Sequence, residues 1–169
     1  LGLTPKKTLE DVLNGDCALK DVLVRGPGGV QLVPATSGVQ RMAELAVGER
    51  AGLLHAFSEL ADVTDILVVD TAAGIAANAM QFCDASHEVI VVVCNDPASI
   101  TDAYATIKVL NQRNRRSRFR ILVNRTNDDE EAFGLYKRLL GVTDRFLDVS
   151  LDFAGSIPFD AKVPHAARR

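Results

Sequence analysis

Short apolar runs alternate with amphipathic stretches along this sequence, and this alternation limits its fold more than any other feature. Three of the runs end in a polar residue: Asp65–Asp70, Glu88–Asn95 and Arg118–Asn124. Two other stretches, Ala98–Asn111 and Glu130–Leu140, carry apolar residues at helical spacing. Because strands that alternate with helices form βαβ units, we expect an α/β fold with a mostly parallel sheet and helices on both faces. The polar strand ends would then share the carboxyl edge of the sheet, where ligands bind in such folds.

The remaining segments predict shorter elements. Arg41–Leu60 is typical of a long helix that Gly48 and Gly52 weaken. We also expect short helices at Thr8–Asn14 and Ala18–Leu23, a turn at Gly26–Gly29, and short strands at Val30–Pro34, Phe146–Leu151 and Gly155–Pro158. Because no internal repeat or low-complexity linker interrupts the pattern, the sequence predicts a single domain over residues 1–169.

Charge and cysteine usage exclude several classes of protein. The 19 Lys and Arg residues against 22 Asp and Glu leave a net charge of −3, so the whole domain has no electrostatic attraction for nucleic acid. The apolar runs are far shorter than the roughly 20 residues that span a bilayer, and no signal peptide opens the chain, which predicts a cytosolic protein. Three cysteines without a Cys-x-x-Cys pair predict reduced, buried thiols, and the scattered histidines give no support to a transition-metal site.

The pattern Asp70-Thr-Ala-Ala-Gly74 directly follows the clearest of the predicted strands. An acid at a strand end can hold a water of a Mg²⁺ shell, and a glycine lets a backbone N–H approach a terminal phosphate because no Cβ stands in the way. This spacing is therefore typical of a phosphate-sensing loop. Acids and glycines also end many purely structural strands, so both interpretations stay open from these residues alone.

Five segments together resemble the MinD-like flagellar number regulators, the FleN/FlhG family, which belongs with MinD and ParA to the deviant-Walker P-loop ATPases. The segments are Asp70-Thr-Ala-Ala-Gly74, Glu88-Val-Ile-Val-Val-Val-Cys94, Asp96-Pro-Ala-Ser-Ile-Thr-Asp-Ala-Tyr104, Val142-Thr-Asp-Arg-Phe-Leu-Asp148 and Gly155-Ser-Ile-Pro-Phe-Asp160. The resemblance covers essentially the whole chain. The Thr-Ala-Ala-Gly variant and the Pro-x-Ser-Ile-Thr-Asp-Ala-Tyr helix start are more specific to the flagellar branch than to the superfamily.

The resemblance implies a base-binding side of the site. Asn124 and Arg125 match the adenine-side pair, in which an amide reads the edge of the base and a guanidinium lies on its face. Pro158, Phe159 and Asp160 match the loop that closes over the base. The structural alternatives are strand-end capping for the pair and an ordinary turn for the loop.

The resemblance also implies a metal side, which this chain carries only in part. Asp70 matches the switch II acid that supports the magnesium shell, and Gly74 matches the glycine that closes that switch. A P-loop ends in Gly-Lys-Ser/Thr, yet Gly-Lys occurs nowhere in the 169 residues. Leu1–Thr8 resembles the stretch just after switch I. We therefore expect a MinD-like domain truncated at its N-terminus, without the P-loop and switch I, which binds ATP weakly or not at all.

Loss of that segment has a structural consequence as well. In the family the P-loop strand is central in the sheet, so its absence predicts neighbouring strands with unpaired edges. We expect self-association of the chain through such edges.

Five arginines, Arg113, Arg115, Arg116, Arg118 and Arg120, crowd the end of one predicted helix and the start of the next strand. They are compatible with a solvent-exposed connection, in which the carboxyl end of the helix stabilises their positive charge. They are also compatible with a docking patch for an acidic partner or a membrane surface.

By resemblance, the parent protein is a switch that dimerises with Mg²⁺-ATP and separates on ATP hydrolysis, and its output is control of flagellar number. The implied partners are the flagellar master transcription factor and the signal-recognition-type GTPase that places the flagellum. The implied location is the cytoplasm, with peripheral contact at the inner membrane or cell pole left open. The alternatives are a nucleotide-free scaffold of the same fold, a ParA-type partition ATPase, which the net acidity disfavours, and a cobyrinic-acid synthase type of amidoligase.

Overall fold

The computed structural model describes residues 5–34, 47–61, 63–71 and 73–167. The chain forms two compact units, Leu1–Asp70 and Thr71–Arg169, and each is described by itself. That both belong to one ATPase domain stays a prediction.

The first unit is built from short elements. They are α1 (Leu9–Leu13), the 3₁₀ helix η1 (Leu19–Val22), β1 (Val24–Arg25), the 3₁₀ turn η2 (Pro27–Gly29), β2 (Gln31–Leu32) and α3 (Val47–Ser58). Thr8 caps α1, because its backbone N–H donates to Asp11 Oδ2 at 2.7 Å while its hydroxyl accepts from the backbone of Glu10. The short helix and the turn that the sequence predicts here are confirmed, whereas residues 41–46 of the predicted long helix lie outside the described residues.

The run Asp65–Asp70, the clearest strand predicted from the sequence, does not form a strand. Ile66 and Val68 are 81% and 82% exposed. Neither sheet of the described residues includes this run, so its backbone groups have no strand beside them to pair with. The prediction was wrong because an apolar pattern identifies residues suited to a sheet but does not supply the partner strand.

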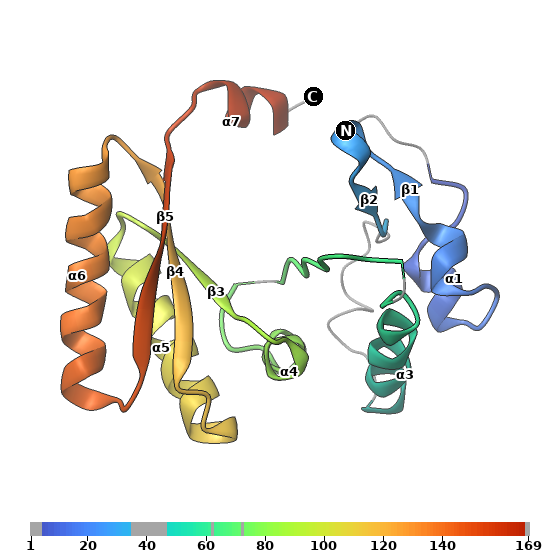
Figure 1. Ribbon diagram of the computed structural model, residues 1–169, viewed down its shortest axis with the longest axis horizontal. Coiled ribbons are helices and arrows are strands. Elements are labelled where there is room, and N and C mark those ends of the chain that lie inside the picture. Colours follow the sequence, from blue (N-terminus) through green and yellow to red (C-terminus); the bar gives the residue numbers. More distant parts are fainter. Residues whose placement is uncertain (1–4, 35–46, 62, 72, 168–169) are drawn as a thin grey trace. The chain divides into compact units, whose positions relative to one another are not determined.

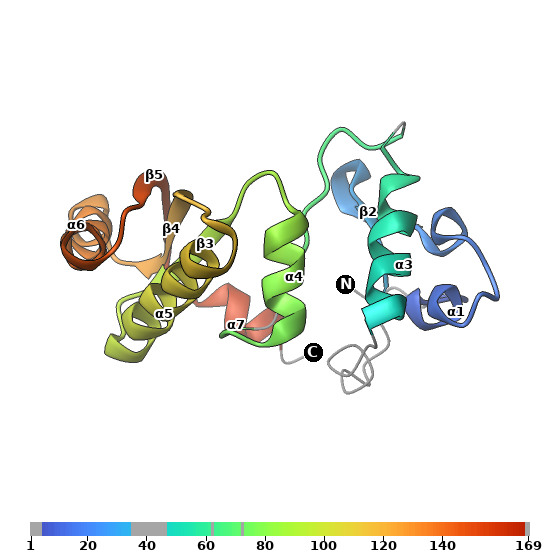
Figure 2. The ribbon, with the colours of Figure 1, turned by 90° about the horizontal axis from the view of Figure 1, so that it is seen from below.

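The second unit contains a three-stranded parallel sheet in the order β3-β4-β5 (Figures 1 and 2). Its elements are α4 (Ala77–Ala85), β3 (Ile90–Cys94), α5 (Pro97–Asn114), β4 (Arg118–Thr126), α6 (Asp129–Phe146), β5 (Ser150–Pro158) and α7 (Lys162–Ala167). The strands that the sequence predicts at Glu88–Asn95 and Arg118–Asn124 are confirmed, and so is the α/β class with a parallel sheet.

The core of this unit lies between the sheet and two helices. Helix α5 packs against β3, while α6 packs against β4 and β5. The buried side chains that fill this space include Val91 and Val93 of β3, Ile121 and Val123 of β4, Ile107 and Leu110 of α5, and Leu135 and Leu139 of α6. On the opposite face of β3, Ile90 and Val92 are 54% and 51% exposed. Among the described strands β3 pairs only with β4, as expected for a strand with an unpaired edge; self-association stays a prediction.

Both long helices extend past their predicted limits at both ends. Asp96 caps α5 by accepting the backbone N–H of Ala98 on Oδ1 at 2.7 Å. Helix α6 continues to Phe146 and β5 begins only at Ser150, so the strand predicted at Phe146–Leu151 is wrong in its first four residues. Thr143 is buried, so the buried side of α6 continues past Leu140. The three cysteines are free, as predicted, but half-buried rather than fully buried.

Candidate functional site

The carboxyl end of β4 carries an asparagine and an arginine in succession, Asn124 and Arg125. Asn124 Oδ1 accepts the backbone N–H of Arg125 at 2.9 Å. Within the described residues no hydrogen bond uses Asn124 Nδ2, so this amide group is available to a ligand. Arg125 has a φ of 61°, in the left-handed region that residues other than glycine rarely adopt.

The end of β5 brings an aromatic ring to the same place. Thr126 lies opposite Pro158 in the β4–β5 register, and the backbone N–H of Phe159 donates to Thr126 O at 2.9 Å. The guanidinium carbon of Arg125 consequently lies 5.9 Å from the centre of the Phe159 ring. Phe159 is 51% exposed, so part of the ring stays open to solvent.

Of the five residues predicted for the base-binding side, the structure places the side chains of Arg125 and Phe159 together, with Pro158 opposite Thr126 and the Asn124 side chain against the Arg125 backbone. The carboxylate of Asp160 instead accepts the backbone N–H of Lys162 at 2.8 Å and starts α7. An exposed ring beside a planar cation suits a planar heteroaromatic ring, since such rings stack on aromatic side chains and guanidinium groups.

Asp70 and Gly74 lie on either side of the boundary between the two units. Asp70 is exposed and makes no hydrogen bond or ion pair with the described part of the chain, so its carboxylate is accessible. Gly74 has a φ of 90°, and a Cβ built there would meet no atom within 4 Å. Glycine is therefore required at position 74 by backbone conformation rather than by lack of space. A common site of Asp70 with the base-side residues of the second unit stays a prediction.

The residues present fit the base half of a nucleotide better than its phosphate half. No group of three His, Cys, Asp or Glu side chains among the described residues is arranged to hold a metal ion. Mg²⁺ bound with a nucleotide needs only one or two carboxylates in addition to phosphate oxygens and waters, and that Asp70 serves as one of them stays a prediction. The lysine and the loop amides that surround phosphates in P-loop proteins have no counterpart in the sequence, because it contains no Gly-Lys pair.

A hydrogen-bonded network beside the base-side residues was not found from the sequence. Glu131 accepts the side-chain amide of Asn95 on Oε1 at 2.6 Å and accepts both the backbone and side-chain N–H groups of Asn127 on Oε2, at 2.8 and 2.9 Å. Arg138 completes it by donating to Asn95 Oδ1 at 3.1 Å. These bonds hold the pKa of Glu131 below its usual value. The bond from the Asn127 backbone has the largest effect, followed by the bond from the Asn95 side chain. The sequence feature that could have indicated this network is the seven-residue spacing of Glu131 and Arg138, which places both side chains on one face of the helix.

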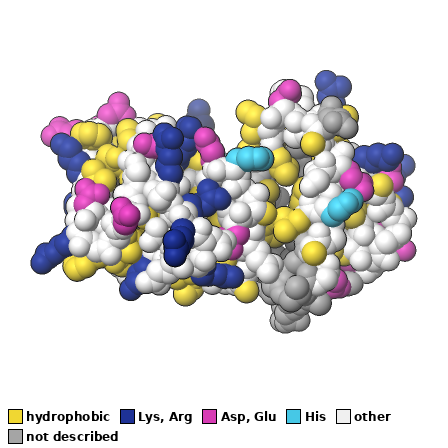
Figure 3. All heavy atoms as spheres, turned by 60° about the horizontal axis from the view of Figure 1, so that its bottom comes forward, with side chains coloured by type: hydrophobic (Ala, Val, Ile, Leu, Met, Phe, Trp, Pro, Cys, Tyr) yellow, Lys and Arg dark blue, Asp and Glu magenta, His cyan; other side chains and the backbone are white. Residues whose placement is uncertain are grey.

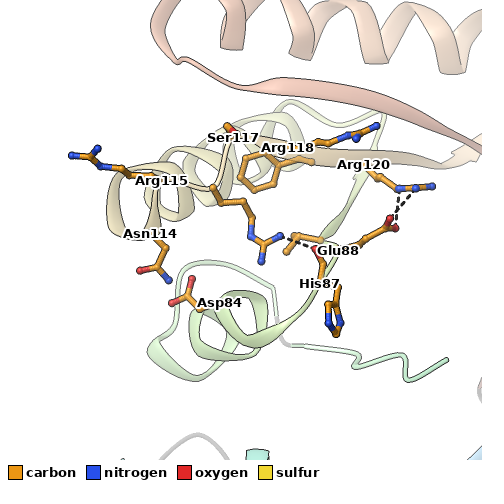
Figure 4. Close-up of a pocket in the computed structure, with 11 residues that line it drawn as sticks. Asp84, His87, Glu88, Asn114, Arg115, Ser117, Arg118 and Arg120 are labelled. Atoms are coloured by element: carbon orange, nitrogen blue, oxygen red, sulfur yellow. Dashed lines mark hydrogen bonds and ion pairs between the residues drawn. The ribbon is translucent and has the colours of Figure 1, made fainter. Parts of the chain in front are cut away.

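The arginine-rich connection forms one side of a pocket of about 490 Å³ (Figure 4). Arg120 is ion-paired with Glu88 at 2.9 Å and Arg118 with Asp152 at 2.7 Å. Arg116 donates to three backbone carbonyls at the end of α4. Arg115 points away from the pocket in Figure 4. Arg116, Arg118 and Arg120 thus bond to groups within the second unit, as expected of a structural connection. Docking of an acidic protein or a membrane at this surface stays a prediction.

Basic and acidic side chains alternate on the surface drawn in Figure 3, where Lys and Arg lie in separate groups with Asp and Glu among them. No described helix is both long and apolar enough to cross a membrane.

Comparison with known proteins gives the following relatives. The chain is 52% identical, over all of its 169 residues, to the antiactivator FleN of Pseudomonas aeruginosa PAO1, and it covers 60% of that protein. It is 30% identical over 157 residues to the flagellum site-determining protein YlxH of Helicobacter pylori 26695, of which it covers 53%. It is 29% identical over 168 residues to an uncharacterized ATP-binding protein of Methanocaldococcus jannaschii, of which it covers 60%. No family model matches the sequence.

Among solved structures, a ParA family ATPase from Chlorobium tepidum TLS superposes with a TM-score of 0.73 at 17% identity, over 97% of this chain and 66% of that one. This likeness confirms the P-loop NTPase-like α/β fold. The chain spans less than two thirds of the length of each of these proteins.

Proposed function

We propose, from the premise that this chain belongs to the FleN/FlhG family of MinD-like proteins, that it provides the base-binding part of an ATP-dependent regulator of flagellar number. Identity of 52% along its whole length to a protein named antiactivator FleN supports the flagellar assignment. The name of YlxH, a flagellum site-determining protein, supports the same branch. The 60% coverage of FleN supports the expectation that the lysine and loop amides of the phosphate site belong to the rest of a longer protein.

The observation that carries the proposal is the placement of the Arg125 guanidinium over the Phe159 ring, with the side chain of Asn124 against the Arg125 backbone. In this site Arg125 would lie on the face of adenine while the N–H groups of Asn124 reach acceptors on its edge. Asp70 would hold a water of the magnesium shell. When bound, Mg²⁺-ATP supplies the β–γ phosphoanhydride whose hydrolysis resets the regulator.

The wider mechanism is part of the same proposal. ATP would hold two subunits together, and hydrolysis would separate them, so that the dimer forms only while nucleotide is bound. Control of flagellar number would follow from contact of one of these states with the flagellar master transcription factor and with the signal-recognition-type GTPase, in the cytoplasm or at the inner face of the membrane.

The test is calorimetric titration of Mg²⁺-ATP into the longer protein that includes the residues preceding Leu1. We expect Arg125→Ala to weaken binding about tenfold, because stacking of a guanidinium on a base is worth on the order of 1–2 kcal/mol. Arg145→Ala is the matched control, since Arg145 makes a similar contact with Phe146 at 5.3 Å that has no part in the proposed site. Equal losses in both variants would contradict the base site. Absence of binding by the unmodified protein would favour the nucleotide-free scaffold.

A further inference from the structure

The carboxylate of Glu131 joins two loops that are distant in the sequence. Asn95 follows β3, and Asn127 lies between β4 and α6; Glu131 bonds to both at 2.6 to 2.9 Å. A glutamate in the first turn of a helix commonly accepts a backbone N–H near the helix start, and its bonds to Asn127 conform to this role. Its second oxygen, however, is directed at Asn95, and no helix cap requires that bond.

Asn95 is held from two sides by one face of α6. Its Nδ2 donates to Glu131 and its Oδ1 accepts from Arg138 at 3.1 Å. The amide thus has its donor end on an acid and its acceptor end on a base, so its orientation is determined. The loop after β3 is consequently tied to the same helix that receives the loop after β4.

The chain directly after Arg125 is anchored at two points. Thr126, which is 2% exposed, accepts the backbone N–H of Phe159 at 2.9 Å, and the backbone N–H of Asn127 donates to Glu131 at 2.8 Å. Arg125 itself is in the left-handed conformation. Such a conformation in a residue other than glycine persists only where the surroundings hold it, and the two residues that follow Arg125 supply these anchors.

We propose that Glu131 is a positioning residue of the base site: by fixing Asn127 and Asn95 together, its carboxylate keeps Arg125 over Phe159 in the orientation that receives a purine ring. The role rests on the proposed nucleotide-binding function. Glu131 itself does not touch the base.

The role of Glu131 can be tested by exchanging the hydrogen-bond acceptor at position 131 with the donor at position 95. Glu131→Gln puts an NH₂ group against the N–H donors of Asn95 or Asn127, and Asn95→Asp puts a second carboxylate against Glu131. In the double variant the carboxamide at position 131 donates to the carboxylate at position 95 and still accepts from Asn127. Arg138 then pairs with a full negative charge. Glu130→Gln is the control, because the neighbouring Glu130 is exposed and has no part in the network.

Two measurements distinguish this role from capping alone. In the 169-residue chain, NMR reports the ring-current shift of the Arg125 side-chain protons by Phe159. We expect it to fall in each single variant and to return in the double variant. In the longer protein, calorimetry should show ATP binding weakened about tenfold in each single variant and restored to within about threefold in the double, as charge-assisted bonds of this kind are lost and re-formed.

The inference is overturned if the double variant is no better than the single variants, or if Glu130→Gln has the same effect. It is overturned also if the ring-current shift is lost while ATP affinity is unchanged. Absence of ATP binding by the unmodified longer protein would remove the proposed function, while the ring-current series would still show whether the network holds Arg125.

Discussion

Replacement of Arg116 by alanine should destabilise the second unit, although the residue lies in a connection rather than in the core. Its guanidinium donates to the carbonyls of Cys83, Ser86 and His87, at 3.1, 2.6 and 3.2 Å. These groups lie at the carboxyl end of α4, where a helix favours a positive charge. At about 1 kcal/mol for each bond, the loss is at most about 3 kcal/mol, and partial rehydration of the carbonyls reduces it to about 2 kcal/mol.

The assay is thermal unfolding followed by circular dichroism. For a unit of about 100 residues, 2 kcal/mol lowers Tm by roughly 10 °C. Arg116→Lys should recover less than half of this loss, because one ammonium group does not reach three carbonyls as the planar guanidinium does. Arg115→Ala is the matched control and should change Tm little. A Tm of Arg116→Ala within about 2 °C of the unmodified chain, the range of neutral surface substitutions, would refute the reasoning, and so would full recovery with lysine.

Four further predictions follow from individual residues. Arg115→Gly should raise Tm by several degrees, because the left-handed conformation of Arg115 at the end of α5 costs about 1 kcal/mol in a residue other than glycine. Burial raises the pKa of the Cys83 thiol while Arg116 lowers it, so iodoacetamide should alkylate Cys83 slowly near neutral pH and still more slowly in Arg116→Ala. Because folding lowers the pKa of Glu131, its ionised form stabilises the fold above about pH 4.5, and this contribution is lost as the pH falls through the lowered pKa; Glu131→Gln should flatten that acid limb of a stability curve. Finally, Asp70→Ala in the longer protein should abolish most ATP turnover with little change in Tm, whereas unaltered turnover would leave Asp70 a structural residue.

Much of the second unit was predictable because its determinants are local. The apolar runs at Glu88–Asn95 and Arg118–Asn124 and the cap at Asp96 follow from residues that are neighbours in the sequence. Even the error at the end of α6 is local, since Thr143 continues the buried stripe that the predicted boundary at Leu140 ended too early.

The base-side group was identified from the sequence only through resemblance. No spacing rule joins Arg125 to Phe159, because 33 residues separate them and their contact depends on the pairing of β4 with β5. The structure shows the Asp160 carboxylate accepting the backbone N–H of Lys162 at the start of α7, and its place in the base site stays a prediction. Resemblance indicates which residue types gather at a site, while the direction of each side chain is set by its neighbours in space.

Local sequence alone sets where helices and parallel strands can form, because hydrophobic periodicity and capping residues act over a few neighbouring positions. Whether a suitable segment becomes a strand was decided only by tertiary structure, since a strand exists through the hydrogen bonds of its neighbour: Glu88–Asn95 has β4 beside it, while Asp65–Asp70 has no described strand beside it and is not one. Tertiary structure alone also decided that Glu131 holds Asn95, because a bond across 36 residues forms only once the sheet has placed both ends together.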